Sequence, residues 1–413
     1  TGWMNGDIKL ATLSDTDDTD LVGSELVTNG TFDSDLTGWT AVNSTLSVVS
    51  GKLRVTSAGG DWGDATQSFP VEAGKTYVAT IGDITPNTGQ AYWAILNSGV
   101  NIGYVNNFTK TLTFTPTSTG NCTITLRVSQ TSGDNSDYDN ISVRLAEPDR
   151  SVNNNGLQVF GTVQKNPVAT GADLVAYSGF STSNYLEQPY NSDLDFGTGD
   201  FCYMGWGKLS SVTSRNIVCR VNPAGISLGE GARIIIGNHV GSGGNVRAII
   251  GNSTFVSGWI PPLTNEWTHV CVTRKDNILN IFVNGGLEYS GASYHDVTNT
   301  EAKVSVGSLY YNGNQGVDGC TTSLVKISGT APTAEQIKKI YEDEKVLFQE
   351  NAKATLHGTS DAVTALAYDT DTTLLHVGTS AGRSVFQGLR RVDNTTDAVG
   401  GAISASNGLV VEE

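Results

Sequence analysis

The chain has 413 residues, more than a single hydrophobic core supports, so two or three domains are expected. It contains 48 Gly and only 2 Met, and charged residues make up 16%, a composition that favours strands joined by tight turns over helices. With 41 acidic and 25 basic residues the formal charge is −16, which would repel a nucleic-acid backbone, so nucleic acid is not expected as a partner.

No apolar run approaches the roughly 20 residues that span a bilayer, so membrane insertion is not expected. The sequence begins at Thr1 without a basic and apolar leader, which suggests a fragment of a longer polypeptide. Its cysteines are far apart and several stand within apolar strand patterns, so we expect reduced, buried thiols rather than disulfides or a zinc site. They are Cys122, Cys202, Cys219, Cys271 and Cys320.

Residues 1–23 contain one strand-like run, residues 7–13, followed by a polar and acidic stretch, residues 14–20. The second stretch has too little apolar content to be ordered by burial. We interpret the segment as a propeller-like strand and a linker.

Residues 24–148 show short runs in which apolar and polar residues alternate, separated by Gly, Asn and Asp. The clearest runs are residues 52–56, 76–81, 92–96, 110–114 and 123–128. Short strands with turn signals every ~8 to 12 residues are typical of a β-sandwich.

Three motifs of this segment carry a family resemblance: Leu26-Val-Thr-Asn-Gly-Thr-Phe-Asp with Leu36-Thr-Gly-Trp, Gly74-Lys-Thr-Tyr, and Tyr138-Asp-Asn-Ile-Ser-Val. The segment resembles carbohydrate-binding modules with a galactose-binding-like jelly roll. The resemblance implies a structural Ca²⁺ between the first and last strands, with Asp33, where the family usually has Glu, and Asp139 as candidate ligands. A Ca²⁺ site takes about 6 to 8 oxygen ligands, so backbone carbonyls would have to contribute. The alternative is that both carboxylates only cap turns.

Sugar binding requires an aromatic face for the apolar side of the ring and amide, carboxylate or guanidinium groups for its hydroxyls. Trp62 lies in the turn-rich Gly59-Gly-Asp-Trp-Gly-Asp, and Tyr92 alternates with Trp93 on one strand, so at least one of the latter two can face outward. Analogy with the family places Trp62 and Tyr92 in a binding cleft, with Gln90 and Arg127 beside them. Packing within the core or a loop is the alternative for each ring.

Residues 149–350 form a second unit whose later strands alternate almost without interruption. Leu194-Asp-Phe-Gly-Thr-Gly-Asp-Phe, Glu266-Trp-Thr-His-Val-Cys-Val-Thr-Arg and Leu279-Asn-Ile-Phe-Val-Asn-Gly make it similar to the concanavalin A-like, laminin-G type lectin sandwich. A short amphipathic helix is predicted over residues 334–344, with Thr333 as its N-cap. Tyr310 and Tyr311 are predicted in a loop at one end of this sandwich, where lectin-like folds often bind ligand.

No catalytic residue is expected in either unit. A glycosidase on a concanavalin A-like frame needs two carboxylates about 5 Å apart or somewhat farther, and families of this fold usually carry both on one strand. No strand here has that Glu-x-Asp-x-Glu type of pattern, and the sequence has no Gly-x-Ser-x-Gly or His-Glu-x-x-His motif. The chain is therefore interpreted as a binding protein rather than an enzyme.

Residues 351–413 change pattern again, to strand-like runs at residues 362–369, 374–379 and 382–386, which look like part of a propeller blade, and a Gly, Ala and Ser rich tail predicted to be mobile. Such blade-like segments at both ends suggest that residues 24–347 are inserted in a propeller-like repeat. The fold prediction is all-β: two consecutive jelly-roll β-sandwiches, short propeller-like β segments at both ends, and one short helix toward the C-terminus.

This mosaic resembles bacteriophage tail fibre, spike and other virion surface proteins. The resemblance implies adhesion to a cell-surface polysaccharide or other host glycan, assembly in the host cytoplasm, contacts with other virion subunits and a homotrimeric assembly. Two alternatives remain: an ancillary carbohydrate-binding region of a secreted bacterial polysaccharide-degrading enzyme, or a purely architectural virion protein.

Overall fold

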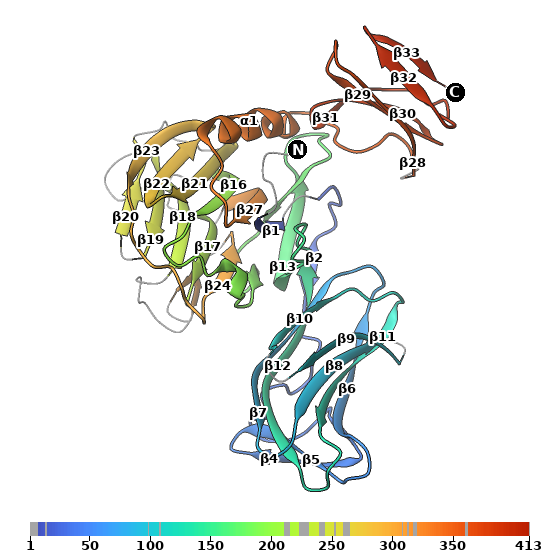
Figure 1. Cartoon of the computed structure of the whole chain (residues 1–413), viewed down its shortest axis with the longest axis vertical. Helices are drawn as coiled ribbons and strands as arrows, with labels where there is room; N and C mark the ends of the chain where they lie inside the picture. The colour runs from blue at the N-terminus through green and yellow to red at the C-terminus, as the bar shows by residue number, and fades with distance from the viewer. Residues whose placement is uncertain are drawn as a thin grey trace.

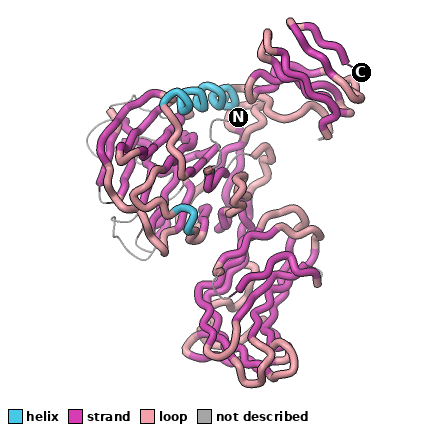
Figure 2. Tube along the Cα trace, viewed as in Figure 1, coloured by secondary structure: helices cyan, strands magenta, loops and turns pink. Residues whose placement is uncertain are grey.

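The alternating sequence pattern becomes strands arranged in two β-sandwiches and a smaller C-terminal sheet, and the all-β prediction is confirmed (Figures 1 and 2). The computed structural model describes residues 7–12, 15–97, 99–106, 109–209, 215–222, 231–238, 244–251, 253–258, 265–307, 309–311, 314–316, 320–359 and 362–412.

The first sandwich consists of two facing antiparallel sheets. One sheet has the order β3 (Thr40–Val42), β6 (Gly63–Val71), β11 (Gly120–Val128), β8 (Ala91–Asn97) and β9 (Val100–Asn106). The other has the order β4 (Ser44–Val49), β5 (Lys52–Ser57), β12 (Asn135–Glu147), β7 (Tyr77–Pro86) and β10 (Thr111–Phe114). Side chains from the inner faces, Trp93 and Tyr138 among them, are fully buried between the sheets.

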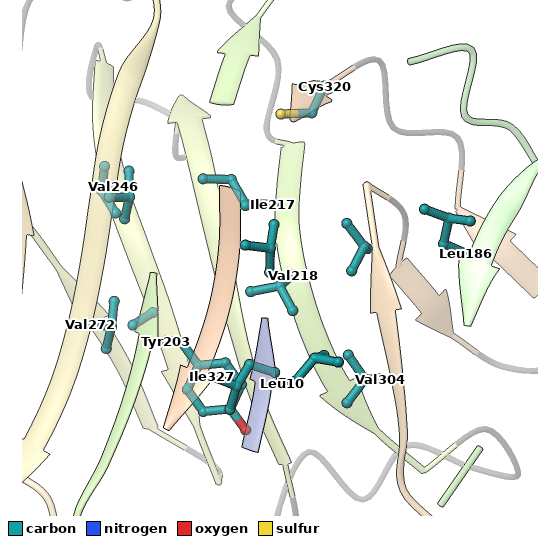
Figure 3. Packing of buried hydrophobic residues seen from close by; sticks show 14 of the residues in the cluster. Leu10, Leu186, Tyr203, Ile217, Val218, Val246, Val272, Val304, Cys320 and Ile327 are labelled. Atoms are coloured by element: carbon teal, nitrogen blue, oxygen red, sulfur yellow. The ribbon is translucent and has the colours of Figure 1, made fainter. Parts of the chain in front are cut away.

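The second sandwich is larger. One sheet has the order β14 (Val175–Ser178), β27 (Cys320–Ser328), β16 (Phe201–Leu209), β21 (Thr268–Lys275), β22 (Ile278–Val283) and β23 (Gly286–Ala292). The other has the order β15 (Tyr185–Gln188), β24 (Lys303–Val306), β17 (Arg215–Val221), β18 (Gly231–Asn238), β19 (Gly244–Ile250) and β20 (Ser253–Val256). Figure 3 shows the core between them, to which Tyr203, Val272 and Ile327 come from the first sheet and Leu186, Val218 and Val304 from the second. The short strands β25 (Leu309–Tyr311) and β26 (Asn314–Gly316) pair only with each other.

Strand β13 (Leu157–Pro167) belongs to both sheets of the second sandwich. Its first residues pair with β15 and its last with β14, while β2 (Leu21–Gly23) pairs with its middle. The strand changes sheet at Gly161, whose φ is +62°, and a Cβ there would lie 2.2 Å from Oδ1 of Asn184, so only glycine fits. Because Ala146 and Glu147 at the end of β12 pair with the start of β13, a backbone ladder also joins the two sandwiches.

Helix α1 (Ala334–Glu344) covers the outer side of β16, β21 and β22. It begins with a capping box in which Thr333 and Gln336 bond each other's backbone N–H. Its buried residues Ile337 and Ile340 pack against an apolar patch of the sheet formed by Cys202, Met204, Cys271 and Phe282. A 3₁₀ turn, η2 (Lys345–Phe348), follows the helix, and another, η1 (Ser192–Leu194), lies earlier in the chain. The predicted helix is therefore confirmed, and no helix among the described residues is long and apolar enough to cross a membrane.

All five cysteines are free and buried, as the sequence predicts. They lie on strands β11, β16, β17, β21 and β27. Two of them, Cys202 and Cys271, have their sulfur atoms 3.6 Å apart beneath α1. They therefore behave as small core side chains.

The C-terminal sheet is antiparallel and has the order β28 (Val363–Asp369), β29 (Leu374–Thr379), β30 (Gly382–Gln387) and β31 (Arg390–Asn394), of which the first three correspond to the predicted strand-like runs. It lies apart from both sandwiches in Figure 1. The segment leading to it is held by Asp173, whose Oδ2 accepts hydrogen bonds from the backbone of Ala354 and the hydroxyl of Thr355.

The predictions for the two ends need correction. The first strand, β1 (Ile8–Thr12), pairs with β27 and buries Leu10 completely in the core of the second sandwich. It therefore completes a sandwich sheet instead of a propeller blade, and the described residues of the two ends share no pairing, which removes the basis for an insertion within a propeller.

The polar stretch after β1 is ordered by specific contacts rather than by apolar burial. Asp15 pairs with the buried Lys165 at 2.5 Å, and Oδ1 of Asp20 accepts the backbone N–H of Lys165. At the other end, residues of the tail predicted to be mobile form the hairpin β32 (Ile403–Ser406) and β33 (Leu409–Glu412), which Arg383 holds through an ion pair with Glu412.

Candidate functional site

Four of the residues predicted to bind sugar come together at one end of the β3-β6-β11-β8-β9 sheet. Arg127 on β11 is paired in register with Tyr92 on β8 and with Asp64 on β6, so these three side chains form a row across the outer face. Trp62 directly precedes β6, and Gln90 directly precedes β8. We call this group, Trp62, Asp64, Gln90, Tyr92 and Arg127, the Trp62 surface.

The aromatic rings of the Trp62 surface are half-buried and pack edge to face. The ring centroids of Trp62 and Tyr92 are 5.5 Å apart with an interplanar angle of 83°. The guanidinium carbon of Arg127 lies 5.6 Å from the centroid of the Trp62 ring, within range of a cation–π contact. The Tyr92 hydroxyl donates to Oε1 of Gln90 at 2.5 Å, which fixes the position of that amide. The cluster thus combines apolar ring surface with groups that bind hydroxyls.

Asp64 is the residue of the Trp62 surface that the sequence prediction missed. Its carboxylate accepts two parallel hydrogen bonds from Arg127, Nε to Oδ1 and Nη2 to Oδ2, each 2.8 Å long. The Asp64 side chain is only 11% exposed, whereas that of Arg127 is 35% exposed. Two parallel charge-assisted bonds fix the plane of a guanidinium, so Asp64 holds Arg127 in place beside the rings. Its position two residues after Trp62, on the same side of an alternating strand, is the signal that could have found it.

The backbone beneath the Trp62 surface is fixed from the opposite sheet. Tyr138 on β12 is fully buried, and its hydroxyl donates to the carbonyl of Arg127 at 2.7 Å, with the carbonyl of Tyr92 at 3.2 Å. The loop carrying Trp62 is held by Asn43, whose Nδ2 donates to the carbonyl of Asp61 at 2.9 Å. A rigid backbone reduces the entropy lost when a ligand is bound.

A strip of hydroxyl side chains continues from the Trp62 surface along the same face. Residues two and four positions from Asp64 and Arg127 face the same side of the sheet. They include Thr66, Ser68 and Thr123, and the hydroxyls of the last two are 3.0 Å apart. The face therefore offers hydrogen-bonding groups beyond the aromatic cluster.

The two residues predicted to bind Ca²⁺ bond to residues close to them in the chain. Oδ2 of Asp33 accepts a hydrogen bond from the Thr31 hydroxyl at 2.8 Å, and both carboxylate oxygens of Asp139 accept bonds from Asn140. The part of the chain that the structure describes holds no group of three or more His, Cys, Asp or Glu side chains suited to a metal ion. A Ca²⁺ ion at Asp33 and Asp139 would thus depend on backbone carbonyls for its other ligands, and the site stays a prediction.

The candidates in the second sandwich, Tyr310 and Tyr311, lie on β25, and their side chains are outside the part that the structure describes. Their role therefore stays a prediction.

Comparison with known proteins bears on the second sandwich. Residues 180–338 match the family model for the concanavalin A-like lectin/glucanases superfamily. No curated protein matches the chain at a significant level.

Several solved structures are distantly similar in fold. Domain 4 of AbnA, a GH43 extracellular arabinanase from Geobacillus stearothermophilus solved with arabinotriose, is 16% identical and has a TM-score of 0.36, over 47% of this chain and 92% of that chain. The binding domain of Paraclostridial Mosquitocidal Protein 1 is 14% identical with a TM-score of 0.39, over 58% of this chain and 62% of that chain. A heptameric SAP-like pentraxin from Limulus polyphemus is 13% identical with a TM-score of 0.30, over 38% and 80%. The family match shows that residues 180–338 are similar to concanavalin A-like lectin and glucanase domains, in agreement with the resemblance drawn from the sequence.

Proposed function

We propose that the chain is a non-catalytic adhesion protein that binds a cell-surface glycan through the Trp62 surface. The observation that carries the proposal is the convergence of Trp62, Tyr92, Arg127 and Gln90 on one sheet face, with Asp64 fixing the guanidinium. A sugar ring has an apolar face that packs on aromatic side chains and equatorial hydroxyls that pair with amides, carboxylates and guanidinium groups. The Trp62 surface supplies both kinds of group.

The proposal is tested by measuring glycan binding with variants of the two rings. Trp62→Ala and Tyr92→Ala should each lower affinity for a glycan, identified on a glycan array, by about tenfold or more, since the loss of one good contact of about 1.4 kcal/mol has that effect. Tyr368→Ala is the matched control, because Tyr368 is 56% exposed on the C-terminal sheet. Unchanged binding by both ring variants would contradict the proposal.

The same preparation tests for catalysis. We propose binding without turnover, so incubation with the bound polysaccharide should release no new reducing ends. Release of reducing sugar that depends on the chain would overturn this part of the proposal.

We also propose, from the sequence resemblance, that the glycan belongs to a host cell and that the chain acts at a virion surface beside other virion subunits. Purified chain should then compete with intact particles for adsorption to cells that carry the bound glycan. Trp62→Ala should compete less well, and equal competition by both forms would indicate that adsorption does not use the Trp62 surface.

A further inference from the structure

A cleft lies between the two sandwiches. It has a volume of about 720 Å³, and its described lining comes from residues 109–113, residues 153–156, residues 188–192 and Thr300. Ligand sites in proteins commonly measure about 300 to 1,000 Å³. We call it the inter-sandwich cleft, and it shares no lining residue with the Trp62 surface.

The described side chains that line the inter-sandwich cleft are mostly uncharged groups that can form hydrogen bonds. They are mainly amides and hydroxyls, among them those of Asn153, Asn155, Asn191, Thr111 and Tyr190. No described lining residue is acidic, although the chain has 41 acidic residues. The one lysine, Lys110, donates from Nζ to the carbonyl of Gly82 at 2.7 Å.

Two amide side chains of the cleft wall each have one polar atom without a hydrogen-bond partner among the described residues. Gln188 is 2% exposed, and its Nε2 donates to the carbonyl of Asn155, but its Oε1 has no partner among the described residues. Asn191 accepts the backbone N–H of Asp193 through Oδ1 and leaves Nδ2 without a partner there. Leaving a buried amide atom without a hydrogen bond costs free energy. A ligand hydroxyl that pairs with either atom as the side chain turns toward the cleft would recover part of that cost.

The wall contributed by the first sandwich is the edge of a sheet. Strand β10 pairs with β7, and no other described strand pairs with it, so its second edge carries backbone N–H and C=O groups without ladder partners. The first three residues of this strand and the two residues before it, 109–113 together, line the cleft. Backbone groups of this kind add donors and acceptors to those of the amides.

We propose that the inter-sandwich cleft binds an uncharged oligosaccharide that contacts both sandwiches at once. A cation would find no carboxylate among the described lining residues, an anion would find one lysine in a chain of net charge −16, and an apolar ligand would find few apolar side chains. A ligand with many neutral hydroxyls matches the amides, hydroxyls and strand edge. The site is separate from the Trp62 surface, so the two proposals stand independently.

The experiment uses the full chain with Trp62→Ala, which weakens binding at the Trp62 surface. The probes are neutral xylo-, cello-, arabino- and galacto-oligosaccharides of three to six sugars, measured by isothermal titration calorimetry. At least one should bind, and hydrogen exchange of residues 109–113 and 188–192 should slow in its presence.

Two variants in this background block the cleft. Thr111→Trp places a large ring on the half-buried edge-strand position that lines it. Asn191→Asp keeps the oxygen that caps Asp193 but replaces the Nδ2 donor. Each should lower affinity at least tenfold. Thr45→Trp is the matched control, because Thr45 is exposed on β4 at the opposite edge of the same sheet, and this substitution should leave binding unchanged.

The outcomes separate the two sites. Binding that survives Trp62→Ala and is lost with Thr111→Trp but not with Thr45→Trp supports the cleft. No binding of any probe by the Trp62→Ala chain, or binding that Thr111→Trp leaves intact, overturns the cleft proposal whatever the Trp62 surface does. Binding of extended peptides in place of sugars, by strand addition to β10, would overturn it as well.

Discussion

Arg127 is held by Asp64 in the same two-bond geometry that joins Arg54 to Asp137 on the opposite sheet of the first sandwich. The acids are equally buried, since Asp64 and Asp137 both have side chains that are 11% exposed. Only the Asp64 pair lies beside the rings of Trp62 and Tyr92. A comparison of variants in the two pairs can therefore separate an effect on glycan binding from an effect on the stability of the fold.

The first prediction compares variants of these two ion pairs. Asp64→Asn should lower glycan affinity about tenfold, because Arg127 loses its bidentate partner and is no longer fixed beside the rings. Asp137→Asn should leave affinity unchanged. Both variants should change the free energy of unfolding by only about 1 kcal/mol, as is usual for partly exposed ion pairs, which denaturant unfolding would measure. Equal loss of affinity in both would indicate a general effect on the sandwich.

Glu147 is an ionisable residue buried at the junction of the two sandwiches. It is 1% exposed, and burial raises the pKa of its carboxyl to about 7, although nearby Tyr177, Lys165 and Arg150 act in the opposite direction. A folded-state pKa above the usual value of 4.5 means that the folded chain holds a proton that the unfolded chain releases.

The second prediction concerns the pH dependence of stability that this raised pKa of Glu147 causes. Stability linked to Glu147 is fully present below pH 4.5 and is lost as the pH rises to about 7, by up to about 3 kcal/mol. Glu147→Gln cannot ionise and should lack this loss, so its advantage over the parent chain should grow between these pH values and level off above them. Denaturant unfolding across this range measures the difference, and a constant difference would contradict the prediction.

At the scale of elements, the alternation of apolar and polar residues predicted the strands well, because the burial of one strand face follows from the order of neighbouring residues. The predicted runs at residues 52–56, 110–114 and 123–128 became β5, β10 and β11. The partner of a strand cannot be inferred from neighbouring residues, so the sequence prediction assigned β1 to the wrong sheet. Residues 8–12 indicate a strand but not that it pairs with β27. The polar residues 14–20 were taken for a linker because hydrogen bonds such as that from Lys165 to Asp20 leave no hydrophobic pattern.

For the candidate site, likewise, the sequence predicted individual residues but not how neighbouring strands align them. Trp62, Tyr92, Gln90 and Arg127 were found from residue type, strand position and family analogy, and the structure brings them together. The row that joins Asp64, Arg127 and Tyr92 depends on the register between three strands, which a single sequence does not reveal. The inter-sandwich cleft was missed for the same reason, since its walls come from separate domains.

Helix α1 covers a histidine that cannot easily be charged. His269 on β21 is fully buried, its ring centroid is 5.3 Å from that of Trp206 and 6.2 Å from that of Tyr341 on α1, and neither ring nitrogen has a partner among the described residues. Burial lowers the pKa of His269 to about 4, which Lys326 reinforces and Glu344 opposes.

The third prediction concerns the packing of α1 at acid pH. Because the unfolded chain takes up the proton first, stability linked to His269 is present above pH 6.5 and is lost as the pH falls toward 4. His269→Phe keeps an aromatic ring and removes the titration, so the parent chain should lose up to about 3 kcal/mol relative to this variant over that range. Denaturant unfolding of both forms measures the loss. Parallel pH profiles would show that His269 does not titrate in this way.

For the whole molecule the two titrations oppose each other. Between pH 4.5 and 6.5 Glu147 makes the chain less stable as the pH rises, and His269 makes it more stable. The unmodified chain should therefore show a shallow profile in this interval, and only the single variants expose each contribution.

The fourth prediction tests the Ca²⁺ site implied by the family resemblance. If Asp33 and Asp139 hold an ion only in the folded chain, Ca²⁺ must raise the Tm by mass action, EDTA must reverse the rise, and Asp139→Asn must weaken it. Asp193→Asn, an exposed carboxylate of the second sandwich, is the control. A Tm that responds to neither Ca²⁺ nor EDTA would contradict the predicted Ca²⁺ site.

The pairing of β1 with β27 has a consequence for synthesis. The hydroxyl of Ser328 donates to the carbonyl of Asp7, and these residues are 321 positions apart in the chain. At translation rates of about 5 to 20 residues per second, the N-terminal strand emerges from the ribosome on the order of 15 to 60 s before its partner. The intervening residues 24–148 complete a sandwich of their own in that interval. The nascent chain thus carries Leu10 unprotected until the second sandwich is almost fully translated, and only then can that core close.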